Sequence, residues 1–285
     1  MSIDYLAEVY REYQGQVSLK GFMRLVDQPY WRLRDYLKGE EKREHRQQAL
    51  SQAAAEVTAA AAADTSYGYR RVYQHLRNKG VEIGRECVRH LMGELGLQPP
   101  PPCKKKRQKQ DVTAVEDWPE GRRLQIDATR LTLDDGVAWV YLVEDVKTRQ
   151  CLAASVAANL SQERAAATLL EGDEQLRLLG LTETRLIQSD AGSDFTSHHF
   201  QGICASIGSW VRCRVAQVGG MGILERLNRT FKHDYIFRHE VTTQAELKAL
   251  IPSFMRWYNE RRLHSSLGYR TPASALADEA AMVLS

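Results

Sequence analysis

The sequence predicts an α/β fold in which a mixed sheet flanked by helices follows an all-α amino-terminal region. Apolar runs near residues 122–131, 138–146 and 150–157 have the length and composition of strands. Helical and strand-like segments then alternate, and three antiparallel strands followed by such alternation predict a mixed sheet with helices on both faces. Before residue 99 the apolar residues follow helical spacing, so the two regions differ in class.

The amino-terminal region is expected to be helical throughout. Segments 19–26 and 29–37 indicate a helical pair, and the alanine-rich run 40–63 favours an exposed connecting helix by propensity. Two short helices then end at Gly80 and Gly96, an arrangement typical of a helix-turn-helix, although helical hairpins are also common packing units. The exposed face of this pair would carry cations able to contact phosphates, namely Arg70, Arg71, Arg77, Lys79, Arg85 and Arg89.

A proline-rich and lysine-rich segment separates the two regions. Four prolines at 99–102 disfavour helix, and no acid occurs after them until Asp111. Cations this close together repel one another unless a polyanion lies alongside. We predict a linker that follows DNA, with a solvated surface tail as the alternative. Its cations are Lys104, Lys105, Lys106, Arg107 and Lys109.

The elements after the third strand complete the predicted sheet and its helices. They are a helix near 162–179, a strand near 184–189, a helix near 197–207 and a strand near 210–215. A helix that carries Glu225 follows. The last predicted helix spans 243–262, where Thr243 and Glu246 form a capping box and Pro252 should produce a kink.

Three carboxylates are the candidate site. Asp127 and Asp190 end the apolar segments 124–127 and 186–190, and thirty-four residues separate Asp190 from Glu225. A buried carboxylate requires a compensating cation, and Mg²⁺ prefers oxygen ligands. Two such ions about 4 Å apart stabilise the attacking and leaving oxygens of a phosphodiester displacement. The alternative is that these aspartates only cap turns at strand ends.

Five short segments form a pattern that covers nearly everything from about residue 18 to 275. They are Ser66-Tyr67-Gly68-Tyr69-Arg70-Arg71, Ile126-Asp127-Ala128-Thr129, Gln188-Ser189-Asp190-Ala191-Gly192-Ser193-Asp194-Phe195, Glu225-Arg226-Leu227-Asn228-Arg229-Thr230-Phe231-Lys232 and Tyr258-Asn259-Glu260-Arg261-Arg262-Leu263-His264-Ser265-Ser266-Leu267-Gly268-Tyr269, the last followed by Thr271-Pro272. In this order they resemble the integrase-core subunit (OrfB) of insertion-sequence-three transposases, which are DDE-type relatives of retroviral integrases.

The resemblance implies an RNase H-like core with a mixed five-stranded sheet, in which Asp127, Asp190 and Glu225 bind two Mg²⁺ ions and Mn²⁺ can substitute. It also implies a homo-oligomer on double-stranded DNA, engaging transposon ends and target. An upstream OrfA-type product, or a frameshift fusion with it, would complete recognition of the ends. The sequence departs from the pattern in two places: the interval before Glu225 is one residue shorter, and residues 219–224 replace the usual Asp-Asn-Ala stretch.

The helix that begins near Glu225 is expected to present a polar stripe. On an α-helix, Glu225, Asn228, Arg229 and Lys232 share one face, which predicts one metal ligand and three donors for DNA. In the resembling enzymes a basic residue seven positions after the glutamate contacts substrate DNA, and Lys232 occupies that place. An ordinary solvated stripe is the alternative. Two further cations expected to reach DNA are Arg261 and Arg262.

Composition indicates a cytoplasmic protein with no membrane partner, and the resemblance implies that it is bacterial and nucleoid-associated when bound to DNA. No apolar stretch approaches the roughly 20 residues that cross a bilayer, and residues 1–4 begin no secretory signal. The net charge of +3 is only mildly basic. The cysteines form no Cys-x-x-Cys pair, which argues for reduced thiols and against an amino-terminal zinc domain. They are Cys87, Cys103, Cys151, Cys204 and Cys213.

These observations predict a DNA transposase that cleaves and joins strands at insertion-sequence ends. The alternatives are a catalytically silent or domesticated DNA-binding protein and a simple RNase H-like nuclease, which would leave the helical amino-terminal region unexplained. The expected organisation is a helical region at 1–63, a helix-turn-helix-like module at 64–98, a linker at 99–117, a catalytic core at 118–240 and a helical extension at 241–285.

Overall fold

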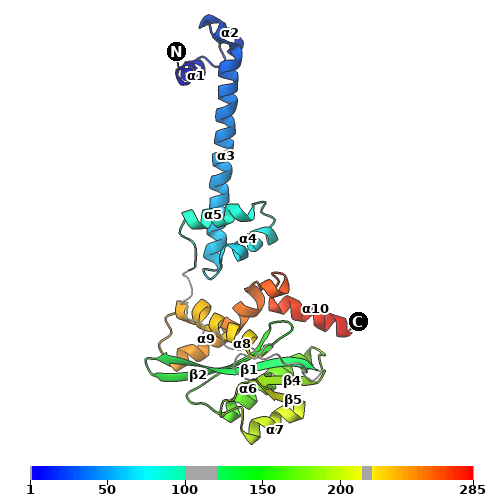
Figure 1. Ribbon diagram of the computed structural model, residues 1–285. Coiled ribbons are helices and arrows are strands. Elements are labelled where there is room, and N and C mark those ends of the chain that lie inside the picture. The colour runs from blue at the N-terminus through cyan, green and yellow to red at the C-terminus, as the bar shows by residue number, and fades with distance from the viewer. Residues whose placement is uncertain (1, 100–120, 214–219, 285) are drawn as a thin grey trace, which may run out of the picture. The chain divides into compact units, whose positions relative to one another are not determined.

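The structure, a computed structural model, describes residues 2–99, 121–213 and 220–284. The chain divides into two compact units, residues 1–102 and 103–285. The first unit is all-helical, as predicted, and the second is built on a single mixed sheet (Figure 1). None of the described helices is long and apolar enough to cross a membrane.

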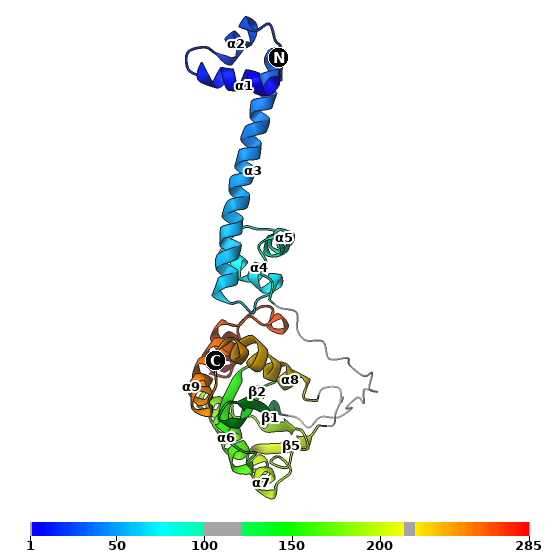
Figure 2. The ribbon, with the colours of Figure 1, turned by 90° about the vertical axis from the view of Figure 1, so that its left-hand side faces the viewer.

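The first unit is organised along one long helix. Helices α1 (Ile3–Glu12) and α2 (Leu19–Leu25) lie at the amino-terminal end of α3 (Tyr30–Ala63), while α4 (Tyr69–Asn78) and α5 (Arg85–Glu94) contact its other end (Figures 1 and 2). The small core at the first end consists of Leu6, Ala7, Phe22, Met23 and Leu33.

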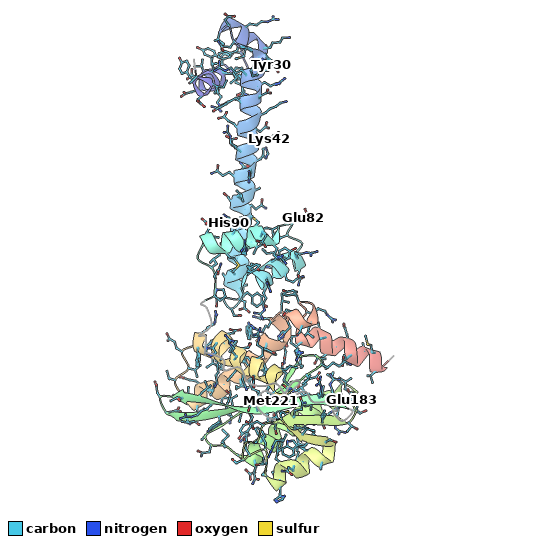
Figure 3. All side chains as sticks on the ribbon, viewed as in Figure 1. Tyr30, Lys42, Glu82, His90, Glu183 and Met221 are labelled. Atoms are coloured by element: carbon cyan, nitrogen blue, oxygen red, sulfur yellow. The ribbon has the colours of Figure 1, made fainter. Side chains whose placement is uncertain are left out.

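Helix α3 corrects one prediction, because the segments 29–37 and 40–63 form a single helix of 34 residues. Gly39 lies inside it without ending it, since one glycine in a helix interior costs only about 1 kcal/mol relative to alanine. The middle of α3 is exposed from residue 41 to 50, and Lys42 lies on this stretch (Figure 3). The predicted ends of α4 and α5 are confirmed by Gly80 and Gly96, which have φ values of +78° and +63°.

The second unit contains the predicted mixed sheet. Its strands are β1 (Arg122–Leu133), β2 (Gly136–Asp145), β3 (Cys151–Ala157), β4 (Arg185–Ser189) and β5 (Gly208–Arg212). They are arranged in the order β3-β2-β1-β4-β5, with antiparallel pairing among the first three and parallel pairing of β4 with both β1 and β5. Strand β5 begins two residues before the predicted start at 210, and residues 214–215 of that prediction lie outside the described residues.

Helices cover both faces of the sheet, which confirms the predicted layers (Figure 1). Helices α6 (Gln162–Leu178) and α7 (His198–Ile207) pack against even-numbered β1 residues such as Leu124 and Ile126. Helices α8 (Gly222–Arg229) and α9 (Gln244–Arg256) cover the other face, to which odd-numbered β1 residues point because side chains alternate along a strand.

Two helices continue into π-helical turns that the sequence pattern did not predict. Helix α8 leads into η1 (Thr230–Tyr235), and α9 leads into η3 (Trp257–Arg261), so the predicted single helix 243–262 is a composite. The capping box of Thr243 and Glu246 is confirmed. The short turns η2 (Ile236–Arg238) and η4 (Ser265–Leu267) and helix α10 (Pro272–Leu284) complete the unit.

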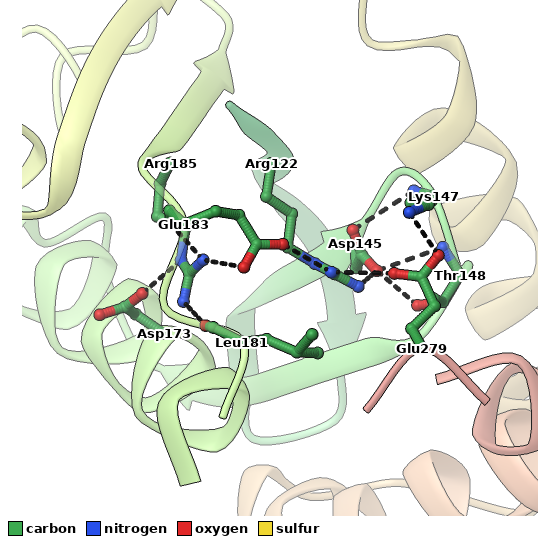
Figure 4. Close-up of polar contacts among 9 residues, drawn as sticks. All are labelled: Arg122, Asp145, Lys147, Thr148, Asp173, Leu181, Glu183, Arg185 and Glu279. Atoms are coloured by element: carbon green, nitrogen blue, oxygen red, sulfur yellow. Dashed lines mark hydrogen bonds and ion pairs between the residues drawn. The ribbon is translucent and has the colours of Figure 1, made fainter. Parts of the chain in front are cut away.

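A buried ion-pair network ties α10 and the loop before β4 to the start of β1 (Figure 4). The Arg122 guanidinium contacts Asp145 at 2.6 Å, Glu183 at 2.9 Å and Glu279 at 3.0 Å, and its side chain is 2% exposed. Breaking such a network by removing one partner is costly, since it leaves an uncompensated buried charge. The network therefore anchors the first residue of the strand that carries Asp127 to α10 and to the loop before β4.

Candidate active site

Strand pairing brings the first two acids together. Asp127 lies in β1 on the face covered by α8, and Asp190 directly follows β4. The parallel register aligns Arg122 with Arg185 and Gln125 with Gln188. The same register, continued by two residues, places Asp127 beside Asp190. The pairing of β1 with β4 is therefore what brings these two aspartates together.

A tight turn presents the Asp190 carboxylate. The Gly192 N–H donates to Asp190 Oδ1 at 2.8 Å, and Asp190 is exposed. A Cβ atom at position 192 would lie 2.6 Å from Asp194 Oδ1 and 3.1 Å from Asp190 Oδ1. Asp194 is itself fixed in the core, where Tyr141 donates its hydroxyl at 2.8 Å. Only glycine allows the turn to close this tightly around the two acids.

The third acid approaches from the opposite layer. Glu225 lies in the first turn of α8, where it is exposed. Leu224 and Leu227 are fully buried against the sheet, and they fix the orientation of this short helix. Strand and helix thus bring together segments that lie almost a hundred residues apart in the chain.

The electrostatics of Asp127 show how closely the acids interact. Burial raises the pKa of the Asp127 carboxyl from 3.8 to about 7, and the negative charges of Asp190 and Glu225 act in the same direction. Two hydrogen bonds oppose this rise in pKa, from the Ala128 N–H at 2.8 Å and from the Asn228 amide at 2.7 Å. The folded environment therefore disfavours the charged form of Asp127.

The donor set suits Mg²⁺, because all three candidate ligands are carboxylates and a hard cation prefers oxygen. A buried acceptor, Asn228 Oδ1, lies beside Asp127 without a hydrogen-bond partner, which leaves room for a donor at this point. Across residues 2–99, 121–213 and 220–284, no group of three or more His, Cys, Asp or Glu side chains is already arranged around one ion position. The negative charges of Asp190 and Glu225 both raise the pKa of Asp127.

The predicted polar stripe on the Glu225 helix requires a correction. Asn228 is only 9% exposed and donates to Asp127 Oδ2, so it belongs to the acid cluster rather than to a DNA-facing surface. Arg229 is exposed at the end of α8, and Lys232 is partly exposed in the π-helical turn. A π-helical turn changes the angular spacing of side chains, so the four residues do not form one uninterrupted stripe.

The two candidates near the carboxy terminus differ from each other. Arg261 is exposed, as expected of a residue that contacts DNA. The Arg262 side chain is 3% exposed, pairs with Asp234 at 2.8 Å and lies 5.2 Å from the centre of the Trp257 ring. Its guanidinium is therefore committed to the interior, and the expectation that Arg262 reaches DNA is corrected.

The candidate cations of the first unit lie on α4 and α5. Arg70 and Arg71 lie over the rings of Tyr69 and Tyr67, at 5.7 and 5.6 Å. Arg85 and Arg89 are exposed and share Glu86, at 3.9 and 2.8 Å. Exposed pairs of this kind contribute little to stability, so both arginines can exchange the glutamate for a phosphate. The candidate cations that fall outside the described residues are Lys104, Lys105, Lys106 and Arg107.

Sequence reasoning missed one residue at this site. Gln125 is fully buried in β1, two residues before Asp127, and its side chain contacts both β4 and α8. The available signal was a polar amide inside the apolar run Leu124-Gln125-Ile126, since a buried amide needs partners.

Comparison with known proteins identifies the relatives of both units. The integrase core domain family matches residues 216–272, and an HTH-like domain family matches residues 45–107. The chain is 24% identical over 221 residues to the putative transposase InsK for insertion sequence element IS150 of Escherichia coli, covering 72% of this chain and 76% of the relative. The resemblance to insertion-sequence transposases is confirmed.

Other transposases match similarly. The transposase for insertion sequence element IS629 of Shigella sonnei is 25% identical over 225 residues, covering 73% of each chain. The integrase core match includes Glu225 and Lys232, whereas Asp127 and Asp190 precede it.

Solved structures that are similar include the HTLV-2 integrase catalytic core domain, with 18% identity and a TM-score of 0.42 over 54% of this chain and 95% of that one. Another is a simian T-cell lymphotropic virus intasome, with 15% identity and a TM-score of 0.45 over 74% and 70%.

Proposed function

We propose that this chain is a DDE-type DNA transposase, a polynucleotidyl transferase that cleaves and joins DNA at the ends of an insertion sequence. The observation that carries the proposal is geometric: the pairing of β1 with β4 aligns Asp127 with Asp190, and a hydrogen bond of 2.7 Å from Asn228 ties Asp127 to the helix that carries Glu225. The charges of both partner acids raise the pKa of Asp127. The relatives are transposases of insertion sequence elements, which supports DNA as the substrate class. The proposed substrate is double-stranded DNA at transposon ends and at the target.

Asp127 is the central ligand in this proposal. Asp127, Asp190 and Glu225 would together hold the two Mg²⁺ ions, and the charges of the other two acids both raise the pKa of Asp127. When bound, the two ions would activate the attacking oxygen and stabilise the leaving oxygen. Mn²⁺, with a similar preference for oxygen ligands, would substitute.

The chain's own groups orient the reaction. Asn228 holds Asp127 through its amide N–H, which donates to Asp127 Oδ2 at 2.7 Å. The attack is in line on phosphorus, first by water and then by a DNA 3′-hydroxyl. In each step one P–O bond forms as the P–O3′ bond of the attacked strand breaks. The attacking hydroxyl loses a proton, and the leaving oxygen gains one and departs as a DNA 3′-hydroxyl, without becoming bonded to the protein.

The two units would have different roles. We assign binding of transposon ends to the module at 64–98 and to the linker at 99–117. We assign DNA cleavage and joining to the core at 118–240, against which the extension at 241–285 packs. The exposed cations on α4 and α5, together with the HTH-like match, support the first assignment. The protein would act in the bacterial cytoplasm as a homo-oligomer on DNA, with an OrfA-type product or fusion completing recognition.

Three substitutions test the proposal. Asp127→Asn, Asp190→Asn and Glu225→Gln should each abolish Mg²⁺-dependent joining of a pre-cleaved transposon end, while DNA binding is retained. Because the acids act as a unit, the double variants should lose no more than the single ones. Asp134→Asn, which changes an exposed acid of the β1–β2 turn, is the matched control. Near-normal joining by Glu225→Gln would show that Glu225 is not one of the three catalytic acids.

A catalytically silent DNA-binding protein is the second candidate. It is favoured by the lack, among the described residues, of a three-ligand group already arranged around one ion. Joining by the unmodified chain decides between the two candidates. End binding without joining at any Mg²⁺ or Mn²⁺ concentration would establish the silent protein.

A further inference from the structure

We propose that Gln125 is a positioning residue whose side-chain amide locks together the three segments that carry the acids, and thereby places Glu225 relative to Asp127. The role assigned to the acids rests on the proposed function. The hydrogen bonds of Gln125 do not rest on the proposed function, and they can be tested by measurements that involve no DNA joining.

Each contact of the amide reaches a different acid-bearing segment. Gln125 itself lies in β1, two residues before Asp127. Its Nε2 donates to Gln188 Oε1 at 2.9 Å, and Gln188 lies in β4, two residues before Asp190. Its Oε1 accepts the Leu224 N–H at 2.9 Å, directly before Glu225.

A further bond fixes the orientation of the amide. Gln125 Nε2 also donates to the Gly220 carbonyl at 2.7 Å. Both N–H groups thus meet oxygen acceptors, and the oxygen meets an N–H donor. A rotated amide would oppose oxygen to oxygen and N–H to N–H, so only one orientation is stable.

The amino terminus of α8 depends on this external partner. Met221, the residue before the helix, provides no side-chain cap. The first N–H groups of a helix have no partner inside it, and here the Leu224 N–H is buried. Gln125 therefore replaces the missing cap from the sheet, and it joins helix and sheet at the residue next to Glu225.

The arrangement explains why the amide, rather than an apolar side chain, is placed in a buried strand. Gln125 is 0% exposed, so a residue without its polar atoms would leave the Leu224 N–H and the Gly220 carbonyl buried and unpaired. Helix α8 has only 8 residues, and a shift at its first turn would move Glu225 directly.

The test uses Gln125→Met in the full chain, since methionine matches glutamine in length but cannot form the contacts. Hydrogen exchange of the Leu224 amide, measured without metal, should accelerate by about tenfold or more once its acceptor is lost. The affinity for Mn²⁺ alone, followed by electron paramagnetic resonance, should fall by about tenfold. When Gln125→Met is combined with Glu225→Gln, it should alter Mn²⁺ affinity less than about twofold, because Gln125 affects the metal only through the position of Glu225.

Two further variants separate positioning from stability. Thr168→Val removes a buried hydroxyl that contacts Ser155 at 2.5 Å on the α6 side of the sheet, and it should leave Leu224 exchange, Mn²⁺ affinity and joining unchanged. Gln125→Glu keeps an acceptor for Leu224, so it should preserve most of the Leu224 protection that methionine loses. If Gln125→Met does not fold, Gln125→Glu tests the same contact by the opposite result: Leu224 should stay protected, and exchange at Leu224 that is about tenfold faster than in the parent would overturn the role of the Gln125 oxygen.

The outcomes are distinct. Unchanged Leu224 exchange in Gln125→Met, or an equal loss of Mn²⁺ affinity with and without Glu225, would overturn the positioning role. Failure of the unmodified chain to join DNA would overturn the proposed function instead, and Leu224 exchange would still decide the contacts of Gln125.

Discussion

The environment of Asp127 disfavours the charged form of its carboxyl group. The free energy of unfolding should therefore depend on pH. The pKa of the carboxyl is raised from 3.8 to about 7 in the folded protein, first by burial and then by the charges of Asp190 and Glu225. Between these pH values the folded state binds the proton more tightly than the unfolded state. The stabilisation is therefore complete below about pH 4 and is lost as the pH rises through about 7.

Asp127→Asn should remove this dependence. In EDTA at pH 8 the variant should have a free energy of unfolding higher than that of the parent by on the order of 1–3 kcal/mol, since asparagine cannot ionise. Near pH 4 the difference should vanish. Urea unfolding at the two pH values measures it, with Asp134→Asn as the exposed control. A difference that is the same at both pH values would contradict the pKa assigned to Asp127.

Lys232 tests whether the η1 turn faces substrate. It lies about two helical turns beyond Glu225, so its ammonium can contact a phosphate beside the acids without ligating a metal. Lys232→Ala should weaken end engagement and joining by roughly 1–3 kcal/mol while Mg²⁺ affinity is retained, and Lys232→Arg should keep part of the activity.

The matched control for Lys232 is Arg226→Ala, which removes an exposed cation of α8 outside the predicted stripe. Joining is measured over a range of DNA concentrations, and metal affinity by isothermal titration. Joining by Lys232→Ala that equals the parent at every concentration would assign this lysine to the solvated face.

Among single elements, the turn after β4 is the most sensitive to a small change. A Cβ at position 192 would lie 2.6 Å from Asp194 Oδ1, an atom of a buried side chain that cannot easily move. Gly192→Ala should lower the free energy of unfolding by about 1–3 kcal/mol and reduce joining, because the Asp190 carboxylate is displaced with the turn.

Gly202→Ala in α7 is the control for that substitution. No atom lies within 4 Å of the Cβ position there, and a glycine-to-alanine change inside a helix stabilises by roughly 0.5–1 kcal/mol. Thermal unfolding of both variants, together with joining, provides the comparison. Equal stability of Gly192→Ala and the parent would show that the turn accommodates a side chain.

Elements also show where sequence patterns succeed. The strands β1 to β4 follow from runs of β-branched and apolar residues, and the α9 cap follows from Thr243 and Glu246, since these signals involve neighbours in the chain. The π-helical turns after α8 and α9 did not follow. They depend on how residues such as Phe231 and Tyr258 pack against distant elements, which no local pattern contains.

For the whole molecule, the division into two units leads to a prediction about DNA binding. The fragment Asp111–Ser285 should keep the core fold and bind Mn²⁺, yet lose most affinity for transposon ends. It lacks the cations of α4, α5 and the linker, so fewer phosphates are neutralised and the slope of log affinity against log salt should be shallower. Equal affinity and an equal slope for fragment and full chain would show that the first unit does not clamp DNA.

The sequence by itself determined the class of each region and most element positions, because periodicity and composition are local properties, and it singled out the three candidate acids. Only the tertiary structure decided what those residues contact. Pairing of β1 with β4 brings Asp127 to Asp190, burial turns Asn228 and Arg262 inward, and Gln125 meets Leu224 across the sheet–helix interface. Such contacts join residues far apart in the chain, and their free energy depends on burial and partner geometry that exist only once the layers have packed.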